Sequence, residues 1–369
     1  MFSKFRNLIF KIDPEIAHNL AIKSLKLNIA TNIFDENKKD PMFETTLFGK
    51  KIDNPIGLAA GFDKNAEVYN AIFKLGFGFV EVGTVTPLKQ YGNPKPRVFR
   101  LVEDQALINR LGFNNLGAEN VSSRISMNKP KGLIGVNLGP NKDTDNRLND
   151  YLIGLRAFHN LVDYITINIS SPNTENLREF HEENKFDELM NLIFNEREKL
   201  NSNIPIVLKI SPDINEDKIE KITSILINHK VKAVIISNTT EANRENLKNI
   251  SKYQKGGLSG KPLEQKSNIL ISKFYSFLNG KIDIIGVGGI DSGKSAYDKF
   301  SAGASYLQLY TGMVYKGPGI IREIKKELIS ILENEKIKTI KDAIGISTWP
   351  LTNQQLYIRR NLLWVKNVN

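Results

Sequence analysis

Short hydrogen-bonding side chains crowd the end of one apolar stretch of the sequence. Residues 164–169 are mostly apolar and β-branched, and residues 170–174 follow them as Ser-Ser-Pro-Asn-Thr. A strand that runs straight into such a turn presents several small polar groups at one strand end, which is where barrel enzymes keep their chemistry. Asn168, Ser171 and Asn173 are therefore the first candidates for catalysis or ligand binding.

Carboxamides recur at the ends of other predicted strands. Asn109, Asn137 and the pair Asn238-Thr239 each stand at or near the end of a short apolar run. A carboxamide offers both a donor and an acceptor, so a ring of them suits a planar ligand with alternating N–H and C=O groups. A single Asn in a loop is usually a turn former, but five at one face are not explained in that way.

Two lysines accompany predicted strands. Lys209 lies inside the apolar run 206–210, where a buried cation needs an anionic partner, and Lys64 follows the first strand. A single lysine at a barrel rim commonly extends its ammonium group into water. That alternative fits Lys209 poorly, and a flavin reduced to its anion would give Lys209 a partner.

Glycines follow three neighbouring strands. Gly288-Gly289, Tyr310-Thr311-Gly312 and the segment 257–260 stand after the seventh, eighth and sixth apolar runs. The dinucleotide pattern G-x-G-x-x-G fails, because Asp291 stands where the third glycine is required. Backbone N–H groups after the last strands of a barrel bind phosphate, so a phosphate-bearing cofactor is predicted.

Composition excludes several classes of site. The chain has no cysteine, and its four histidines are scattered, so we expect no metal site and no thiol nucleophile. The net charge of +11 permits attraction to nucleic acid or anionic lipid, although a lysine-rich solvated surface explains it more simply. With no apolar run of about 18 residues and no signal peptide, we expect an intracellular protein, either soluble or attached to a membrane surface.

The elements that must position these residues form a regular series. Short apolar runs recur at 56–60, 79–85, 132–138, 164–169, 204–210, 233–237, 282–287 and 305–310, mostly with helical segments between them. None alternates like a half-exposed strand, so the series predicts an α/β fold, a (β/α)8 barrel, rather than an open sheet. A two-stranded ribbon is expected at 43–52, and insertions after the second and fourth strands should cover the active-site face.

The two ends of the chain differ from the barrel. Residues 1–30 contain two short helical patterns, the second starting at Asp13-Pro14-Glu15, and they suit either a membrane interface or a helical hairpin packed on the barrel. The C-terminal tail mixes aromatics and cations, which fits a packed terminal helix or a second membrane contact. We therefore divide the chain into residues 1–40, the barrel 41–345 and an extension 346–369.

Six segments together resemble the dihydroorotate dehydrogenase family. They are residues 59–64 (AAGFDK), 81–87 (EVGTVTP), 109–114 (NRLGFN), 168–174 (NISSPNT), 237–240 (SNTT) and 286–290 (GVGGI). The resemblance runs from the N-terminal helices to about residue 345. It implies a barrel that holds FMN and oxidises dihydroorotate to orotate in pyrimidine synthesis.

Two features resemble class 2, the quinone-linked branch of that family. Ser171 stands where class 1 enzymes have Cys, and the segment 13–18 resembles the helical extension that leads quinone to the flavin. The resemblance implies a peripheral protein of the cytoplasmic face of the cell membrane, attached by residues 1–40. Nucleic acid is not an expected partner, and both a monomer and a homodimer remain open. Ser237 replaces the more usual Thr, and the extension 346–369 has no counterpart.

The resemblance also assigns roles to individual residues. Ser171 is the base, activated by a lowered pKa or by a proton relay through water or Thr, and His18, Arg100 and Tyr310 line a quinone tunnel. The substrate-binding residues implied are Lys64, Asn109, Arg110, Leu111, Gly112, Phe113, Asn168, Asn173, Asn238 and Thr239. The FMN-binding residues implied are Ala60, Gly61, Lys64, Thr84, Asn137, Asn168, Lys209, Ser237, Gly260, Gly289, Tyr310 and Thr311.

Three other functions remain to be separated from this one. A class 1 enzyme would pass the electrons to fumarate or NAD, but Ser171 and the N-terminal helices disfavour it. A flavin-dependent tRNA-modifying barrel would use the positive charge, but that family relies on a Cys that is absent. A non-catalytic phosphate-binding barrel would have no use for Lys64, Ser171 and Lys209 together.

Overall fold

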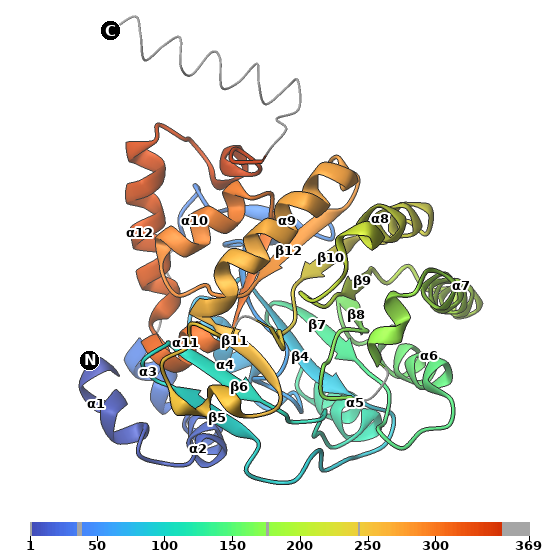
Figure 1. Ribbon diagram of the computed structural model, residues 1–369, viewed down its shortest axis with the longest axis horizontal. Coiled ribbons are helices and arrows are strands. Elements are labelled where there is room, and N and C mark those ends of the chain that lie inside the picture. The colour runs from blue at the N-terminus through green and yellow to red at the C-terminus, as the bar shows by residue number, and fades with distance from the viewer. Residues whose placement is uncertain (1, 35–38, 175–176, 243, 349–369) are drawn as a thin grey trace, which may run out of the picture.

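Eight parallel strands close into a barrel at the centre of the molecule (Figure 1). The computed structural model describes residues 2–34, 39–174, 177–242 and 244–348. The barrel strands, in chain order, are β3 (Ile56–Leu58), β4 (Phe79–Val85), β7 (Leu133–Leu138), β8 (Tyr164–Asn168), β9 (Ile206–Lys209), β10 (Ala233–Ile236), β12 (Asp283–Val287) and β13 (Tyr306–Leu309). Neighbours along the chain pair in parallel, and β13 closes the barrel on β3.

The predicted (β/α)8 barrel is confirmed. Each strand falls within one of the eight apolar runs, and most strands are buried along their whole length. Strands that are covered on both faces cannot alternate polar and apolar residues, which is why continuous runs identified them. The carboxyl ends of all eight strands therefore meet at one face of the barrel.

Helices surround the barrel on its outside (Figure 1). They are α4 (Tyr69–Lys74), α5 (Ala118–Met127), α6 (Arg147–Phe158), α7 (Glu183–Lys199), α8 (Ile219–Asn228), α9 (Glu264–Leu278), α10 (Gly293–Ser301), α11 (Thr311–Lys316) and α12 (Ile320–Asn334). Helix α4 begins only at Tyr69. The Asp63 carboxylate accepts hydrogen bonds from the N–H groups of Glu67 and Val68, and this local alternative to helical bonding delays the helix.

The amino-terminal end of the barrel is covered by the expected ribbon. Strands β1 (Thr45–Leu47) and β2 (Lys50–Ile52) pair antiparallel, and Leu47 and Ile52 pack with Phe79 and Tyr164 in a separate buried cluster. This apolar layer seals the amino-terminal end, so ligands must enter from the carboxyl ends of the strands.

The opposite face carries a three-stranded antiparallel sheet. The insertion after β4 forms β5 (Val98–Leu101) and β6 (Ala106–Asn109), and β6 also pairs with β11 (Gly257–Gly260). The glycine-containing segment 257–260 is thus a strand rather than a loop. Its glycines allow close approach, because a Cβ on Gly260 would lie 2.4 Å from the carbonyl oxygen of Gln105.

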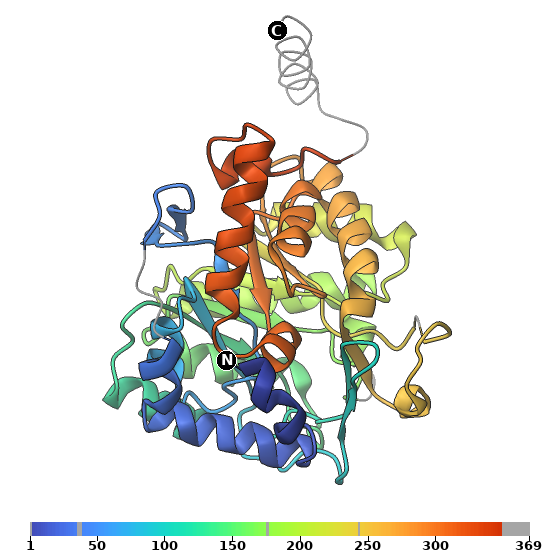
Figure 2. The same ribbon diagram turned by 90° about the vertical axis from the view of Figure 1, so that its left-hand side faces the viewer.

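Three helices at the N-terminus lie together at one end of the molecule (Figure 2). They are α1 (Phe2–Ile9), α2 (Pro14–Lys26) and α3 (Ile29–Phe34), and Asp13 caps α2 as its position before Pro14 predicted. The Arg97 guanidinium pairs with both carboxylate oxygens of Glu15, at 3.0 and 2.9 Å. Arg100 donates to the carbonyl oxygens of Phe10 and Ile12. Two arginines thus attach α1 and α2 to the active-site end of the barrel.

Replacing Glu15 with Gln should loosen α2 without unfolding the barrel. The Arg97 side chain is only 7% exposed, so loss of its partner leaves a nearly buried charge unpaired, at a local cost of about 1–3 kcal/mol. We expect faster amide hydrogen exchange in α2 and unchanged exchange in α8. The control is Lys95→Gln, because Lys95 is 67% exposed and lies 3.9 Å from Glu15. Equal protection of α2 in both variants would contradict this role of Glu15.

Candidate active site

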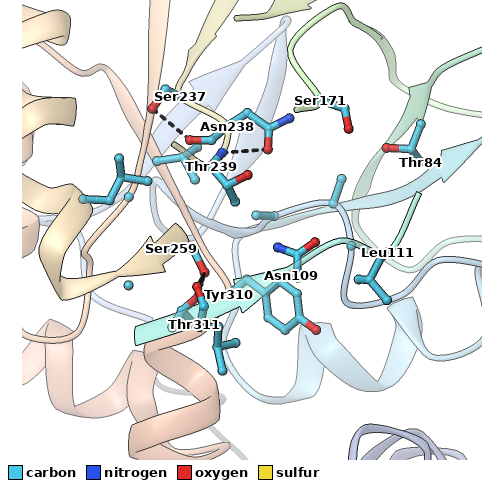
Figure 3. Close-up of a pocket in the computed structure, with 18 of the residues that line it drawn as sticks. Thr84, Asn109, Leu111, Ser171, Ser237, Asn238, Thr239, Ser259, Tyr310 and Thr311 are labelled. Carbon is cyan, nitrogen blue, oxygen red and sulfur yellow. Dashed lines mark hydrogen bonds between the residues drawn. The ribbon is translucent and has the colours of Figure 1, made fainter. Parts of the chain in front are cut away.

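A cavity lies at the carboxyl ends of the barrel strands, between the barrel and the three-stranded sheet (Figure 3). Ser171 and Thr84 lie at one side of it, and Ser259 and Thr311 lie at the other. Residues from the ends of β3, β8, β9, β10, β12 and β13 contribute to its wall. The position is the one that barrel geometry predicts for a binding site.

Most of the residues singled out from the sequence line this one cavity. They are Ala60, Gly61, Lys64, Thr84, Asn109, Leu111, Gly112, Phe113, Asn168, Ser171, Asn173, Lys209, Ser237, Asn238, Thr239, Gly260, Gly289, Tyr310 and Thr311. Asn137 lies beneath the wall and is fully buried. The residues predicted from the sequence are up to about 250 positions apart in the chain, and the fold places them in one cavity.

The Arg110 side chain does not line the cavity. Its guanidinium donates to Gln254 Oε1 at 3.0 Å and to the carbonyl oxygen of Pro96 at 2.8 Å, and it lies over the ring of Phe99. These contacts hold the end of β6 against the segments that precede β5 and β11. The geometry supports a structural role for this side chain, and the substrate contact expected of residue 110 stays a prediction.

Ser171 occupies the turn that follows β8 and is almost fully buried. Its Oγ accepts a hydrogen bond from the N–H of Asn173 at 3.2 Å, which fixes the turn. A serine hydroxyl has two lone pairs, so one remains available to accept a proton from a ligand in the cavity. Ser171 is thus held in the position that a proton acceptor requires.

Lys209 is a buried cation that faces the cavity. Its side chain is 5% exposed, and its Nζ has no ion pair and no hydrogen bond with any residue in the described part of the chain. Burial lowers the pKa of Lys209 below its usual range, and attraction to the buried Glu81 carboxylate opposes that shift. A buried ammonium group without a contact partner favours an anionic or electron-rich ligand.

Lys64 is the second lysine of the cavity. Its Nζ donates to the carbonyl oxygen of Gly61 at 2.7 Å. Burial lowers the pKa of Lys64 to about 8, while Glu15 opposes the shift. At neutral pH most of the population therefore carries a positive charge at this wall of the cavity.

Three polar side chains form a bonded cluster on the floor of the cavity. Asn137 Oδ1 accepts from Thr84 Oγ1 at 2.6 Å and from Asn168 Nδ2 at 3.0 Å. All three residues are buried, so their orientations are fixed by one another rather than by water. Asn168 and Thr84 line the cavity, and Asn137 supports them from below.

The far end of the cavity is built from hydroxyls and glycines. Ser259 Oγ and Thr311 Oγ1 are 2.9 Å apart, and Gly260, Gly288, Gly289 and Gly312 form the adjoining wall. Gly288 has a φ of +120° and Gly289 a φ of +77°, which favour glycine, and a Cβ on Gly289 would lie 2.4 Å from Glu264 Cβ. Backbone groups and two hydroxyls thus line this end, as phosphate binding requires.

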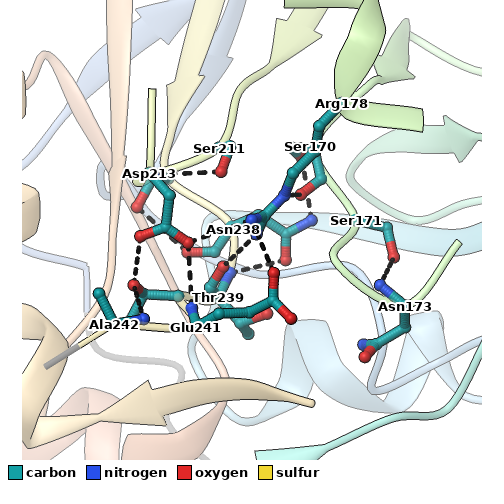
Figure 4. Close-up of polar contacts among 12 residues, drawn as sticks. Ser170, Ser171, Asn173, Arg178, Ser211, Asp213, Asn238, Thr239, Glu241 and Ala242 are labelled. Carbon is teal, nitrogen blue, oxygen red and sulfur yellow. Dashed lines mark hydrogen bonds and ion pairs between the residues drawn. The ribbon is translucent and has the colours of Figure 1, made fainter. Parts of the chain in front are cut away.

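Sequence reasoning missed Arg178, which joins three loops around the site (Figure 4). Arg178 lies in η1 (Leu177–His181) and pairs with Asp213 at 3.2 Å and Glu241 at 3.1 Å. It also donates to the carbonyl oxygens of Ser170 and Thr239. The turn that carries Ser171 is thereby fixed to the loops after β9 and β10. A cation seven residues after Ser171 was the available signal, but its acidic partners are distant in sequence.

A second, largely apolar cavity lies between the N-terminal helices and the barrel. Its lining comes mainly from α1, α2 and α3, and the three predicted tunnel residues His18, Arg100 and Tyr310 all belong to it. Tyr310, Val98 and Leu107 line both cavities, so these side chains separate them. The structure thus brings the predicted tunnel residues next to the active-site cavity.

An aromatic series crosses this boundary. The rings of His18 and Phe62 are 5.2 Å apart, and those of Phe62 and Tyr310 are 5.7 Å apart, both edge to face. Burial and the nearby Lys64 lower the pKa of His18 to about 3, so the imidazole is neutral at physiological pH. His18 therefore acts in this cavity as a polar but uncharged group.

Comparisons with known proteins agree on one family. A family model described as dihydroorotate dehydrogenase matches residues 42–332. A protein of Bartonella tribocorum named dihydroorotate dehydrogenase (quinone) is 45% identical over 91% of this chain and 94% of its own length. A Rhodospirillum rubrum protein of the same name is 42% identical, with 92% of each chain covered.

Solved structures give the same result. The ligand-free DHODH of Eimeria tenella superposes with a TM-score of 0.87 at 37% identity and covers 92% of this chain and 100% of its own. The complex of that protein with ferulenol gives a TM-score of 0.86 at 37% identity, covering 90% and 95%. Sequence and structure together therefore show that this chain belongs to the dihydroorotate dehydrogenase family.

Proposed function

We propose that this protein oxidises (S)-dihydroorotate to orotate in pyrimidine synthesis, with FMN as the hydride acceptor and a membrane quinone as the final electron acceptor. The observation that carries the proposal is the joint lining of one cavity by Ser171, Lys64 and Lys209, next to an apolar cavity under the N-terminal helices. The family and the curated relatives named dihydroorotate dehydrogenase (quinone) support the same reaction.

The residues of the cavity fit FMN. The end with Gly260, Gly289, Tyr310 and Thr311 suits the phosphate, while Ala60, Gly61 and Ser237 line the wall that the rest of the cofactor would contact. Thr84, Asn168 and Asn137 present fixed donors and acceptors for a heterocyclic ring, and Lys209 offers an unpaired charge. When bound, FMN accepts the hydride that leaves the substrate.

The remaining polar groups fit dihydroorotate. Its carboxylate is an anion that Lys64 can bind, and its ring amides match the carboxamides of Asn109, Asn173 and Asn238 with Thr239. Leu111, Gly112 and Phe113 complete the wall and keep water from the reacting carbons, and Asn168 can serve both ligands.

Ser171 Oγ removes the proton from C5 of dihydroorotate. The C6 hydrogen leaves as hydride and the C5–C6 bond becomes a double bond, so the two electrons removed equal those that FMN accepts. A neutral serine is a weak base, so its own hydroxyl proton passes to a water molecule or a Thr hydroxyl as the C5 proton arrives. Arg178 and the Asn173 N–H hold this turn in place.

The N-terminal segment 1–40 fits a quinone site at a membrane surface. Large apolar side chains on α1–α3 and in the turn after α2, namely Phe5, Leu8, Ile16, Leu20, Leu27, Ile29 and Ile33, are between 49% and 70% exposed. Basic residues such as Lys11 and Lys23 lie nearby, an arrangement that favours anionic lipid interfaces. In the described ranges, no helix has the length and apolar character needed to cross a bilayer. We propose peripheral attachment to the cytoplasmic face of the cell membrane.

The domain division follows from these roles. The barrel segment 41–345 binds FMN and substrate, and the segment 1–40 forms the quinone site that reaches Tyr310. The C-terminal extension 346–369 lies largely outside the described residues, which end at Thr348. The two alternatives for that tail, a packed terminal helix and a second membrane contact, both stay open.

Replacing Ser171 with Ala should leave FMN bound and lower kcat by about 10²- to 10⁴-fold, the usual contribution of a general base. The measurement is the rate of flavin bleaching by dihydroorotate in anaerobic stopped flow, with the flavin content as the folding control. A rate within about threefold of wild type would remove Ser171 as the base.

The pH dependence of kcat/KM should report the deprotonation of Lys64. Below its pKa of about 8 the side chain is protonated and attracts the substrate carboxylate, and above that pH the charge is lost. We therefore expect kcat/KM for dihydroorotate to fall with rising pH above about 8, by about tenfold per pH unit. Lys64→Gln should have a low kcat/KM that lacks this decline, and persistence of the decline in the variant would assign it to another group.

Filling the apolar cavity should separate the two half-reactions. Ala17→Trp places a bulky ring among the cavity residues of α2, so the KM for quinone should rise about tenfold while flavin reduction by dihydroorotate stays unchanged. Lys23→Trp is the matched control, because Lys23 lies on the same helix outside this cavity. Equal quinone kinetics in the two variants would exclude the cavity as the quinone site.

A further inference from the structure

Glu81 is a carboxylate buried in the centre of the barrel. It lies on β4, its side chain is fully inaccessible to solvent, and it is not part of the cavity lining. A charged group in such a position is costly unless hydrogen bonds replace its hydration. Nothing in the proposed reaction uses Glu81 directly, so its presence at the buried centre of this strand requires another explanation.

Four donors from three other strands converge on this carboxylate. Oε1 accepts from Asn137 Nδ2 at 2.8 Å, and Oε2 accepts from Tyr164 Oη, Thr166 Oγ1 and Gln308 Nε2, each at 3.0 Å. The amide nitrogens of Asn137 and Gln308 can only donate, so Glu81 acts as the acceptor in both contacts. These contacts replace the hydration that the buried carboxylate has lost.

The contact with Asn137 determines the direction of a longer hydrogen-bond chain. Because the Asn137 amide group is turned to Glu81, its carbonyl faces Asn168 Nδ2 at 3.0 Å. The carbonyl of Asn168 must then face the other way, and it accepts from the N–H and the Oγ of Ser170.

The chain continues to the substrate loops. Ser170 donates its only hydroxyl proton to Asn168, so its Oγ accepts from Asn238 Nδ2 at 2.9 Å (Figure 4). The carbonyl of Asn238 consequently accepts from the N–H of Thr239. Every donor along this path points toward Glu81, so an acceptor-only group at one end fixes the direction of all the links.

We propose that Glu81 is a positioning residue for the reaction: its buried carboxylate fixes which edge, donor or acceptor, Asn168 and Asn238 present to the cofactor and the substrate. This inference rests on the proposed binding of FMN and dihydroorotate in the cavity. A carboxamide turned the wrong way would place like groups together, donor against donor, in a region without water to compensate.

Glu81 also acts on the charge of the cavity. Its attraction raises the pKa of Lys209 against the effect of burial, so it helps to keep that lysine protonated. One carboxylate therefore influences both the orientation of the amides and the charge on the lysine, and neither effect requires contact with a ligand.

The direct test is Glu81→Gln, which preserves size but adds a donor. Asn137 can then turn its carbonyl to position 81, and the chain loses its fixed direction. We expect FMN to dissociate from the purified holoenzyme with a Kd raised at least about tenfold, the factor that about 1.4 kcal/mol represents. The readout is FMN fluorescence on dilution. A wild-type Kd together with a wild-type KM for dihydroorotate would overturn the proposal.

The matched control is Thr166→Val, which removes one donor to Glu81 without breaking the chain. A purely structural role of Glu81 predicts that both variants lower the melting temperature and that both leave the Kd of FMN unchanged. The proposal predicts that Thr166→Val lowers the melting temperature but keeps the Kd within about twofold of wild type, whereas Glu81→Gln changes both.

A second variant covers the case in which Glu81→Gln does not fold. Ser170→Ala interrupts the chain between Asn168 and Asn238 and leaves the surroundings of Glu81 intact. We expect the KM for dihydroorotate to rise about tenfold with FMN affinity retained, and an unchanged KM would contradict the chain. If the wild-type protein itself binds no FMN, the proposed function fails. If the wild type and Glu81→Gln bind FMN equally well and have the same KM for dihydroorotate, only the role of Glu81 fails.

Discussion

Lys209 carries a positive charge into a part of the barrel from which water is almost excluded. Burial disfavours that charge, and the Glu81 carboxylate, which forms no ion pair with Lys209, opposes the effect. Asn168, which lies opposite Lys209 on the neighbouring strand, donates to Asn137 rather than accepting from the lysine. Such a buried charge favours an anionic or electron-rich ligand in the cavity that Lys209 lines.

The second dependence is between the barrel and the N-terminal helices. Arg97 and Arg100 attach α1 and α2 to the strands of the insertion, so these contacts help to hold the helices that line the apolar cavity. Tyr310 belongs to the walls of both cavities and contacts Phe62, which contacts His18. Under the proposed function, substrate and final electron acceptor would occupy these two separate cavities, of which the second is the more apolar.

Local patterns predicted the barrel and most of the site, because buried parallel strands give continuous apolar runs and catalytic residues follow them. They could not predict what depends on distant pairing. Segment 257–260 is a strand because it pairs with β6. The Arg110 side chain lies outside the cavity because it bonds to Pro96 and Gln254. Glu81 gave the same signal as Lys209, a charge within an apolar run, but its four donors come from three other strands.

The electron acceptor tests this account most directly, because the apolar cavity has no purpose in an enzyme that uses a soluble acceptor. The measurement is steady-state oxidation of dihydroorotate by the purified, detergent-solubilised protein, offered a quinone, fumarate or NAD separately. The account predicts turnover with the quinone alone. Turnover with fumarate or NAD would keep the chemistry of the barrel but contradict the roles given to the N-terminal helices, and bound FMN without any turnover would show that the substrate is wrong.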